Sequence, residues 1–285
     1  MPGQIDLHIH TTASDGTDTP RQAVELAAKL GLAAIAITDH DSVFGVAEAC
    51  AAGRELGVEV VPGIEISADY KGNHAHILGL FIDLEAPSLR PALDWAVNER
   101  EARNEKIVGA MEADGLPISL AALRREYPNA VLGRPHMAEH LMKHGIVSSV
   151  KEAFDRYLAD GKPYYRPRER MPMDQAIDAI RQAGGIAILA HPMQYGYDAG
   201  EREAFIQAGI AAGAAGLEAY YSEHSPSEQA ELLDTAARYG LAVSGGSDYH
   251  GARKPHIAMG SGIEGSLDVP FQVLEALKTL IHQDI

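Results

Sequence analysis

The sequence contains a single cysteine, Cys50, among 285 residues, which excludes an intramolecular disulfide. Its apolar runs are short, residues 32–37 being typical, and none approaches the ~20 residues that a helix needs to cross a bilayer. Residues 1–7 carry no basic segment followed by an apolar core, as a secretory signal would. We therefore expect a cytoplasmic protein that acts without a membrane partner.

Basic residues are also scarce, with 24 lysines and arginines against 40 acidic residues and a formal net charge of −16. This balance argues against a broad basic surface for duplex DNA, because duplex binding needs many phosphate contacts. A small anionic substrate stays possible, since bound metal ions can reverse the local sign of charge. Hydrophobic residues make up 46% of the chain, enough for a substantial core.

Short apolar segments alternate with helical segments over much of the chain. Residues 4–10 alternate with period two, which indicates a strand. Thr19 and Pro20 then open a helix that Gly31 ends. Alternating strands and helices with short loops predict a parallel sheet or barrel. The further strands expected are residues 32–38, 58–67, 74–81, 186–190, 217–221 and 241–244.

The stretch from residue 88 to residue 170 breaks this alternation. It predicts consecutive helices with no strong strand between them, at 89–114, 119–126, 135–143 and 150–159. We therefore expect a main domain made of residues 1–87 and 171–285. The helical insertion, residues 88–170, is expected to lie over it.

Histidine and carboxylate residues gather at or near the ends of the predicted strands, the edge at which active sites form in barrels and open α/β sheets. Imidazole and carboxylate without thiolate suit Zn²⁺, Mn²⁺ or Fe²⁺. Nine candidates exceed what one ion needs, and adjacent ions can activate water and clamp an in-line phosphoryl displacement. The candidate ligands are His8, His10, Asp15, His40, Glu65, His76, His191, Asp248 and His250.

A single buried histidine is more often a packed core residue than a ligand. The recurrence of such residues at corresponding strand ends favours a multinuclear metal site over nine unrelated core residues. Two assignments stay open. His74 could be a ligand in addition to His76, because the two share a strand face. Asp39 either binds metal itself or orients His40 without touching the metal.

Seven segments with these residues carry a family resemblance. The chain resembles the PHP (polymerase and histidinol phosphatase) family, which implies a distorted (β/α)₇ barrel, an α/β fold. The resemblance also implies three divalent ions, with Mn²⁺ favoured and Zn²⁺ or Fe²⁺ as alternatives. It implies ligand groups of His8, His10, Glu65 and Asp248, of Glu65, His76 and His191, and of Asp15, His40 and His250. The segments are Asp6-Leu7-His8-Ile9-His10, Ser14-Asp15-Gly16, Thr38-Asp39-His40, Pro62-Gly63-Ile64-Glu65, His76-Ile77-Leu78-Gly79, Ala190-His191-Pro192 and Gly246-Ser247-Asp248-Tyr249-His250.

The insertion is similar to one subgroup of the family, the 3′,5′-nucleoside bisphosphate phosphatases, and to small 5′–3′ exoribonucleases. Gly133-Arg134-Pro135-His136 looks like the segment with which such enzymes hold a substrate phosphate. Arg134 offers a planar fork and His136 a second donor, both near a helix start that favours anions. His140 and His144 follow at helical spacing, and we interpret them as a solvated face.

The resemblance implies hydrolysis of the 3′-phosphate of a 3′,5′-nucleoside bisphosphate, which leaves the 5′-monophosphate and inorganic phosphate. His191 or His250 is expected to assist the leaving alkoxide, and Asp248 is placed with them as a catalytic residue. His224 and Ser225 follow a predicted strand and are expected to touch substrate. Tyr164, Tyr165, Arg166 and Arg168 are considered for contact with a base, and Lys254 and His256 for contact with a second phosphate.

Three alternatives remain beside this reading. The chain could shorten RNA as a 5′–3′ exoribonuclease, although its acidic balance permits only short local contact. It could hydrolyse histidinol phosphate. From another class, it could be a metal-binding module without catalysis, against which the presence of all nine expected ligands speaks.

Overall fold

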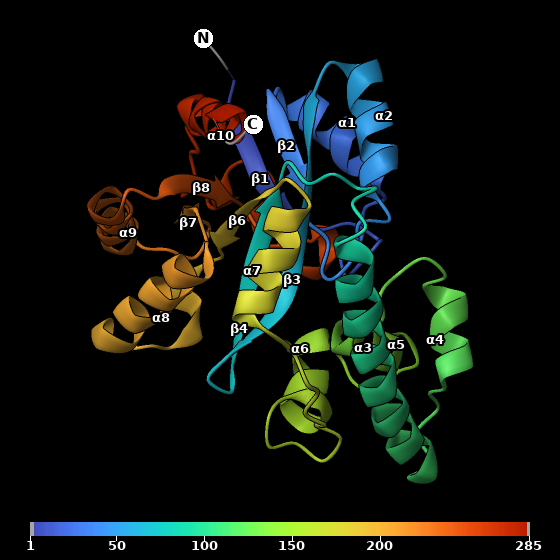
Figure 1. Cartoon of the computed structure of the whole chain (residues 1–285). Helices are drawn as coiled ribbons and strands as arrows, with labels where there is room; N and C mark the ends of the chain where they lie inside the picture. Colours follow the sequence, from blue (N-terminus) through green and yellow to red (C-terminus); the bar gives the residue numbers. More distant parts are fainter. Residues whose placement is uncertain (1–2, 284–285) are drawn as a thin grey trace.

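A computed structural model describes residues 3–283, so residues 1–2 and 284–285 of the predicted main domain lie outside the described residues. Seven strands form a nearly closed barrel, coloured from blue to orange-brown in Figure 1. The predicted (β/α)₇ barrel is thereby confirmed. The barrel strands are β1 (Ile5–Ile9), β2 (Ala34–Ile37), β3 (Glu59–Tyr70), β4 (Asn73–Leu80), β6 (Ile186–Leu189), β7 (Gly216–Tyr221) and β8 (Ala242–Gly246).

The barrel is distorted because one strand runs against its neighbours. Strands β1, β2 and β3 pair in parallel, as do β6, β7 and β8, whereas β4 pairs antiparallel with both β3 and β6. The circle closes where the amide of Asp248 donates to the carbonyl of His8 at 2.9 Å. The amide of His10 donates to the carbonyl of Tyr249 at the same distance. Both closing contacts involve candidate metal ligands.

Helices cover the outside of the barrel, and local sequence sets where they begin and end. Helix α1 (Pro20–Leu30) starts with a capping box between Thr19 and Gln22 and ends at Gly31, which takes the left-handed conformation at φ 75°. The other covering helices are α2 (Val46–Leu56), α7 (Met173–Gln182), α8 (Ala199–Ala212), α9 (Pro226–Tyr239) and α10 (Phe271–Gln283). Short elements complete this part: β5 (Met171–Pro172), which pairs with β3, the 3₁₀ turns η2 (Pro192–Tyr195) and η3 (Gly251–Arg253), and the hairpin β9 (Ile257–Ala258) and β10 (Gly262–Ile263).

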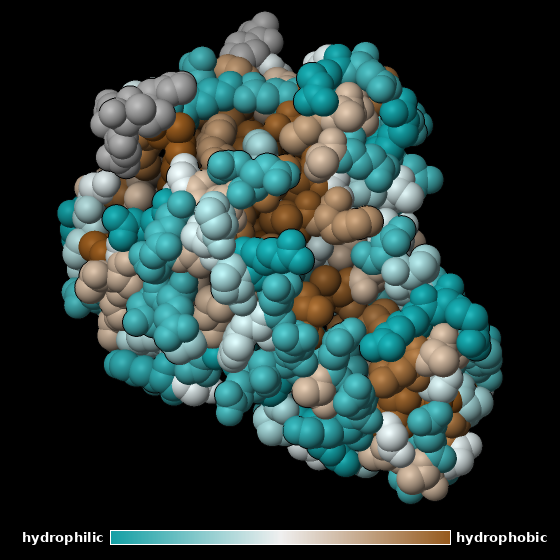
Figure 2. Space-filling model, turned by 45° about the vertical axis from the view of Figure 1, so that its right-hand side comes forward, coloured by the Kyte–Doolittle hydropathy of each residue, from teal (hydrophilic) through white to brown (hydrophobic). Residues whose placement is uncertain are grey.

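Between β4 and β5 the chain forms only helices, drawn in green in Figure 1, which project from one side of the barrel. They enclose a hydrophobic core of their own, built from residues 107–164, which includes Ile107, Leu123 and Leu141. Figure 2 shows this part projecting at the lower right, with apolar residues in recesses between hydrophilic side chains. We refer to it as the helical segment. It comprises α3 (Leu89–Ala113), α4 (Leu120–Glu126), α5 (Arg134–Lys143), α6 (Val150–Ala153) and the π-helical turn η1 (Phe154–Leu158).

Branched aliphatic side chains of the strands, such as Ile64, Ile77 and Leu189, are fully buried in a hydrophobic core that also includes Ile177 of α7 and Phe205 of α8. Within the described residues, no helix is both long and apolar enough to cross a membrane.

Candidate metal centre

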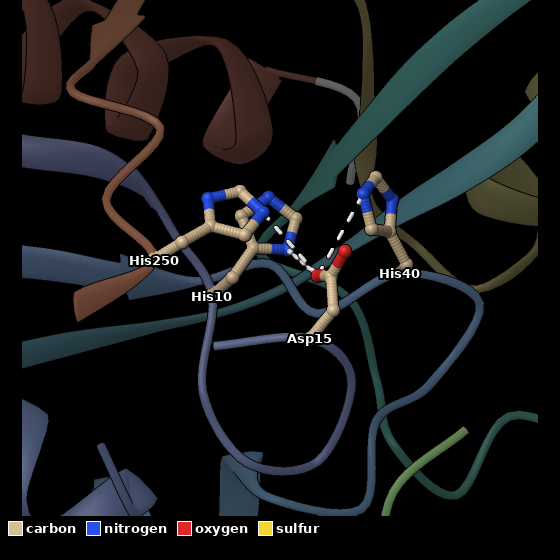
Figure 3. A group of neighbouring side chains, drawn as sticks. All are labelled: His10, Asp15, His40 and His250. Atoms are coloured by element: carbon tan, nitrogen blue, oxygen red, sulfur yellow. Dashed lines mark ion pairs between the residues drawn. The ribbon is translucent and has the colours of Figure 1, made fainter. Parts of the chain in front are cut away.

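All nine candidate ligands meet at one end of the barrel, although they lie up to 242 positions apart in the chain (250 − 8 = 242). They come from the strands themselves or from the loops that directly follow β1, β2, β6 and β8. Most are buried, and Asp15, His40 and His76 are partly exposed. Figure 3 shows four of them, His10, Asp15, His40 and His250, with their rings and carboxylate turned toward one another.

Glu65 lies at the middle of this cluster and uses its two oxygens on different sides. Its Oε1 is 2.8 Å from Nδ1 of His76 and 3.0 Å from Nε2 of His191. Its Oε2 is 2.8 Å from Nδ1 of His40 and 3.3 Å from Nε2 of His10. A carboxylate placed in this way can bridge two ions.

Three members of the first predicted group, His8, His10 and Glu65, lie as close together as ligands of one ion do. Nε2 of His8 lies 3.2 Å from Nε2 of His10, 3.5 Å from Oε1 of Glu65 and 3.6 Å from Oδ1 of Asp248. Nε2 of His10 lies 3.2 Å from the same Asp248 oxygen. Ligands about 2.0–2.1 Å from a central ion stand about 3.3 Å apart at the corners of a tetrahedron. Donor atoms of His8, His10 and Glu65 therefore fit one ion, and the Asp248 carboxylate lies beside both histidines.

The group around Asp15 includes one more histidine than predicted. Oδ1 of Asp15 lies 3.2 Å from Nε2 of His250, 3.9 Å from Nε2 of His40 and 3.8 Å from Nδ1 of His10. The dashed lines of Figure 3 mark these pairs. One ligand atom from each of the four residues falls within 4.8 Å of all the others. His10 thus faces two groups with its two ring nitrogens.

His76 and Glu65 favour the protonation states that metal binding requires, whereas the neighbouring carboxylates raise the pKa values of His8 and His10. Burial lowers the pKa of His76 to about 4, with His40 and His191 acting in the same direction against the Glu65 charge. Burial alone would raise the pKa of Glu65, but His76, His40 and His8 hold it well below its usual range. A neutral imidazole and an ionised carboxylate are the forms that bind metal.

Three buried atoms at the centre lack a hydrogen-bond partner within the described part of the chain, one of them Nδ1 of His191. The other two are Oε2 of Glu65 and Nδ1 of His40, which face each other at 2.8 Å. Buried polar atoms are almost always paired, so a missing partner at such a site calls for an explanation. A cation held by both atoms provides one, and the residues present fit a metal.

Two acidic residues that the sequence analysis did not single out hold the ligands in place. Glu218, in β7, is fully buried; its Oε1 accepts from Nδ1 of His8 at 2.9 Å and its Oε2 from the amide of His191 at 2.8 Å. Asp6, in β1, accepts from the amide and hydroxyl of Ser247, next to Asp248. Each is a lone acid within an apolar strand, and that pattern was the available signal.

The structure decides the two assignments that the sequence left open. Both oxygens of Asp39 are used by the loop after β1: Thr11 donates through its amide at 2.7 Å and its hydroxyl at 2.6 Å, and Ser14 through its hydroxyl at 2.6 Å. Asp39 therefore orients the loop that carries Asp15. His74 is exposed and lies outside the groups of possible ligands among the described residues.

Several residues at the centre have strained backbones. His191 has φ 26°, Asp248 has φ 58° and Asp41 has φ 52°, all in the left-handed region. Such conformations cost about 1–3 kcal/mol each and persist only when the surroundings fix them. The amide of His191 is fixed by Glu218, and that of Asp248 by the carbonyl of His8. The strain turns both side chains toward the cluster.

The three residues expected to be catalytic all lie within the ligand groups. Nδ1 of His250 donates to the carbonyl of Asp248 at 2.8 Å, which leaves its Nε2 to face Asp15. Oδ2 of Asp248 accepts from Lys254 at 2.6 Å and from the hydroxyl of Tyr221 at 2.8 Å. Lys254, considered for a second phosphate, is thus paired with a candidate ligand.

Beside the centre lies a cluster of arginines, which we call the arginine pocket. Asp41, the residue after His40, accepts from Nε of Arg100 at 2.7 Å and from Nη2 of Arg168 at 3.4 Å. Nη2 of Arg100 also donates to the hydroxyl of Ser67, two residues beyond Glu65, at 3.0 Å. The members of the pocket are Arg100, Arg103, Arg134, Arg168 and Arg170.

The arginine pocket holds more positive charge than its neighbours neutralise. Burial, followed by the charges of the other four members, lowers the pKa of Arg103. Nε of Arg103, Nη1 of Arg168 and Nε of Arg170 are buried and have no acceptor among the described residues. In a chain with a net charge of −16, this concentration of unpaired donors marks a place for an anion.

Arg134 and His136 occupy different surroundings. Arg134 belongs to the arginine pocket, where it donates to the carbonyl of Leu158 at 3.0 Å and stacks 5.4 Å from the ring of Tyr165. His136 is buried, and its Nδ1 accepts from the amide of Gly133 at 3.0 Å at the start of α5. Burial and then the Arg253 charge lower its pKa to about 4.

His224 and Ser225 also differ from each other. His224 is buried, donates from Nδ1 to the carbonyl of Ala219 at 3.0 Å, and keeps Nε2 without a partner in the described chain. Ser225 is exposed and caps α9 in a reciprocal pair with Glu228. The structure therefore gives Ser225 a structural role, while His224 retains a free acceptor.

The interpretation of His140 and His144 as a solvated face is wrong for His140. Its side chain is buried where α5 packs on the end of α4, and both ring nitrogens have partners. His144 is exposed, as interpreted.

Comparison with known proteins shows the family of the chain. The PHP domain model matches residues 6–242. A 3′,5′-nucleoside bisphosphate phosphatase of Chromobacterium violaceum is 35% identical over 247 residues, covering 86% of this chain and 87% of that protein. The 5′-3′ exoribonuclease Rnm of Escherichia coli is 34% identical over 272 residues, 91% of each chain. A solved structure of a candidate metal-dependent phosphoesterase from Bifidobacterium adolescentis matches with a TM-score of 0.86 and 31% identity, covering 96% of this chain and 95% of that one.

The family model includes six of the seven segments that carry the resemblance, all except the one at residues 246–250. The resemblance predicted from those segments is confirmed. The chain belongs to the PHP domain family and is a metal-dependent phosphoester hydrolase.

Proposed function

We propose that this enzyme removes the 3′-phosphate of a 3′,5′-nucleoside bisphosphate and releases the 5′-monophosphate and inorganic phosphate. The observation that carries the proposal is the position of the arginine pocket directly beside the metal centre. His40 belongs to the centre, and Asp41, the next residue, accepts from Arg100 of the arginine pocket. A substrate with two phosphates on one ribose can place one in each.

The proposed metal ligands are the nine residues named above, arranged around three divalent ions, with Mn²⁺ as the favoured metal. Glu65 would be shared between groups, because its two oxygens face different histidines. Bound divalent ions supply Lewis acidity, lowering the pKa of water toward about 7 and neutralising charge on phosphoryl oxygens.

The chain's own residues would position the substrate for this chemistry. The unpaired N–H groups of Arg103, Arg168 and Arg170 can donate to the oxygens of the 5′-phosphate. Arg134 adds charge to the same pocket, with the carbon of its guanidinium 5.4 Å from the centre of the Tyr165 ring. His224, whose Nε2 has no partner among the described residues, stays in the proposal as a further substrate contact, and Ser225 does not.

His191, His250 and Asp248 act as ligands in this proposal. A ring nitrogen that binds an ion cannot donate a proton at the same time. Nε2 of His250 faces Asp15, and its Nδ1 proton is committed to the carbonyl of Asp248. We therefore do not carry forward the expected role of His191 or His250 as proton donor.

Two organisational proposals accompany the function. The helical segment, within residues 88–170, is proposed to be a separate insertion, since it has its own hydrophobic core. It contributes Arg100, Arg103 and Arg134 to the arginine pocket, so it would complete the substrate site. Residues 1–87 and 171–285 would then form the catalytic domain.

A 5′–3′ exoribonuclease is the second candidate, and the same pocket supports it. The 5′-phosphate of RNA would occupy the arginine pocket, and the first phosphodiester would take the place of the 3′-phosphate. The relative in Escherichia coli carries that name. Histidinol phosphate fits less well, because it has one phosphate and a cationic amine that the arginines would repel.

The test is a comparison of substrates with the manganese-loaded enzyme. We expect phosphate release from adenosine 3′,5′-bisphosphate to exceed release from adenosine 3′-monophosphate and histidinol phosphate. Adenosine 5′-monophosphate should be inert as the product. Failure to release phosphate from the bisphosphate would remove the proposal, and release of mononucleotides from a 5′-phosphorylated oligoribonucleotide at a higher rate would favour the second candidate.

A further inference from the structure

A second group of possible metal ligands lies in the helical segment, apart from the nine residues at the barrel end. It consists of Glu126, the last residue of α4, and of His140 and His144 at the end of α5. One ligand atom from each residue lies within 4.8 Å of the other two. We call it the α4–α5 site.

The ring of His140 makes the hydrogen bond that a metal-binding histidine commonly makes with its second nitrogen. Its Nε2 lies 2.9 Å from the carbonyl oxygen of Pro117. A carbonyl oxygen can only accept, so Nε2 carries the proton, and in a neutral ring Nδ1 then bears a lone pair. Metal-binding histidines commonly donate their other ring nitrogen to a carbonyl in this way.

The lone pair of His140 points at another lone pair. Nδ1 lies 2.8 Å from Oε1 of Glu126, and the His140 side chain is only 2% exposed. Two acceptors at this distance repel unless a positive charge lies between them or beside them. That charge is either a second proton on the ring or a metal ion.

His144 favours the metal ion. Its Nε2 lies 3.7 Å from the same Glu126 oxygen, and its ring centre is 4.2 Å from that of His140. The two histidines stand four positions apart on the last turn of α5, where residues share a face and the helix dipole favours cations. A simple ion pair between Glu126 and a protonated His140 would leave the placement of His144 unexplained.

The surroundings leave room for water to complete a coordination shell. The three residues line an open hollow of about 600 Å³. Glu112 and Arg125 line the same hollow with opposite charges, so neither sign dominates around the group. Two imidazoles, one carboxylate and an open position are a ligand set that Zn²⁺ accepts.

We propose that Glu126, His140 and His144 bind one additional divalent transition metal ion, with Zn²⁺ as the best match. The ion joins the end of α4 to the end of α5 and thereby stabilises the helical segment. This site is independent of the substrate proposed above and of the ions at the barrel end.

The test counts zinc by equilibrium dialysis and elemental analysis on the full-length protein. His144→Ala removes an exposed ligand without disturbing the core, and Glu112→Gln is the matched control in the same hollow. The wild-type protein and Glu112→Gln should bind one equivalent of zinc more than His144→Ala, while all three hydrolyse phosphoester at the same rate. Equal zinc content in the wild-type protein and His144→Ala would overturn the site. So would an equal loss in Glu112→Gln, which would indicate general attraction by negative charge.

Discussion

The buried carboxylate of Glu218 lies 2.9 Å from Nδ1 of His8, although 210 positions separate the two residues. Its other oxygen accepts from the amide of His191. One side chain in β7 therefore fixes the ring of a candidate ligand in β1 and the strained backbone of another after β6. Burial alone would lower the pKa of His8, but Glu218, Glu65 and Asp248 raise it well above its usual value.

Glu218→Gln should reduce metal affinity or activity about 10- to 100-fold, the usual cost of losing a residue that orients a ligand. Glutamine keeps the size of the side chain but accepts with one oxygen only, so His8 or the His191 amide loses its partner. Metal content and kcat measured on the same preparation would check this. Glu231→Gln, an exposed change on α9, is the control. Wild-type metal binding by Glu218→Gln would contradict the role given to Glu218.

Arg103→Met should lower kcat/KM for the bisphosphate and leave kcat/KM unchanged for a substrate without a 5′-phosphate. Arg103 is 7% exposed and has no acidic partner among the described residues, so its removal leaves none of their carboxylates unpaired. Loss of a charge-assisted hydrogen bond of about 1.5–3 kcal/mol corresponds to about a 10- to 100-fold fall in kcat/KM. The measurement compares kcat/KM for adenosine 3′,5′-bisphosphate with kcat/KM for adenosine 3′-monophosphate.

The control for this prediction is Arg124→Met. Arg124 pairs with Glu101 on the surface and is 57% exposed, so the same change in charge there should leave both substrates unaffected. If Arg103→Met lowers kcat/KM equally for both substrates, the arginine pocket does not bind the 5′-phosphate.

The metal ligands could be predicted from sequence and the arginine pocket could not, for a physical reason. Seven ligands stand near the end of a parallel strand or in the loop after it, and parallel strands bring their ends together whatever the length of chain between them. Glu65 and His76 differ, because Glu65 lies within β3 and His76 within the antiparallel β4. The pocket draws Arg100 and Arg103 from α3 and Arg168 from a loop without regular structure. Only the packing of α3 against the barrel brings them together, and no spacing in the sequence records it.

Other features that the sequence did not predict also depend on how the elements pack together. The apolar run at residues 74–81 predicts a strand but not its direction, and β4 proves antiparallel to its neighbours. His140 shows helical spacing with His144, yet its burial depends on α4, whose docking leaves no periodic pattern. Glu218 and Asp6 carried a signal, a lone acid in an apolar strand, which indicates burial but not the partner.

His136→Asn should change how stability depends on pH. Burial, then Arg253, lowers the pKa of His136 to about 4, against about 6.5 in an unfolded chain. Between these values the unfolded state binds a proton that the folded state does not, so the wild-type protein loses stability as pH falls from about 6.5 to about 4. The loss attributable to this group is up to about 3 kcal/mol, from about 1.4 kcal/mol per pKa unit.

Asparagine at this position can still accept from the amide of Gly133 but cannot titrate. The variant should therefore be less stable than the wild-type protein at pH 7, because packing against Tyr127 is reduced, and the gap should narrow toward pH 4. Urea unfolding at a series of pH values measures this gap. A constant difference across the range would show that His136 titrates normally.

Asp39→Asn separates the support of the metal loop from metal binding itself. Asp39 accepts three hydrogen bonds from Thr11 and Ser14, so an asparagine would turn an N–H group toward at least one donor. An unsatisfied buried donor costs about 1–3 kcal/mol, and we expect this loss in the free energy of unfolding of the metal-free protein. The loop carries Asp15, so metal content should fall as well.

Asp15→Ala is the matched comparison for that variant. Asp15 lies on the same loop, and its carboxylate faces histidines instead of supporting the backbone. Its removal should abolish turnover and lower metal content while leaving urea unfolding of the metal-free protein nearly unchanged. Both variants should lose metal, but only Asp39→Asn should lose stability in the metal-free state. The reason is that Asp39 supports the loop, whereas Asp15 is a proposed metal ligand. Equal stability of Asp39→Asn and Asp15→Ala in the metal-free state would place Asp39 among the ligands instead.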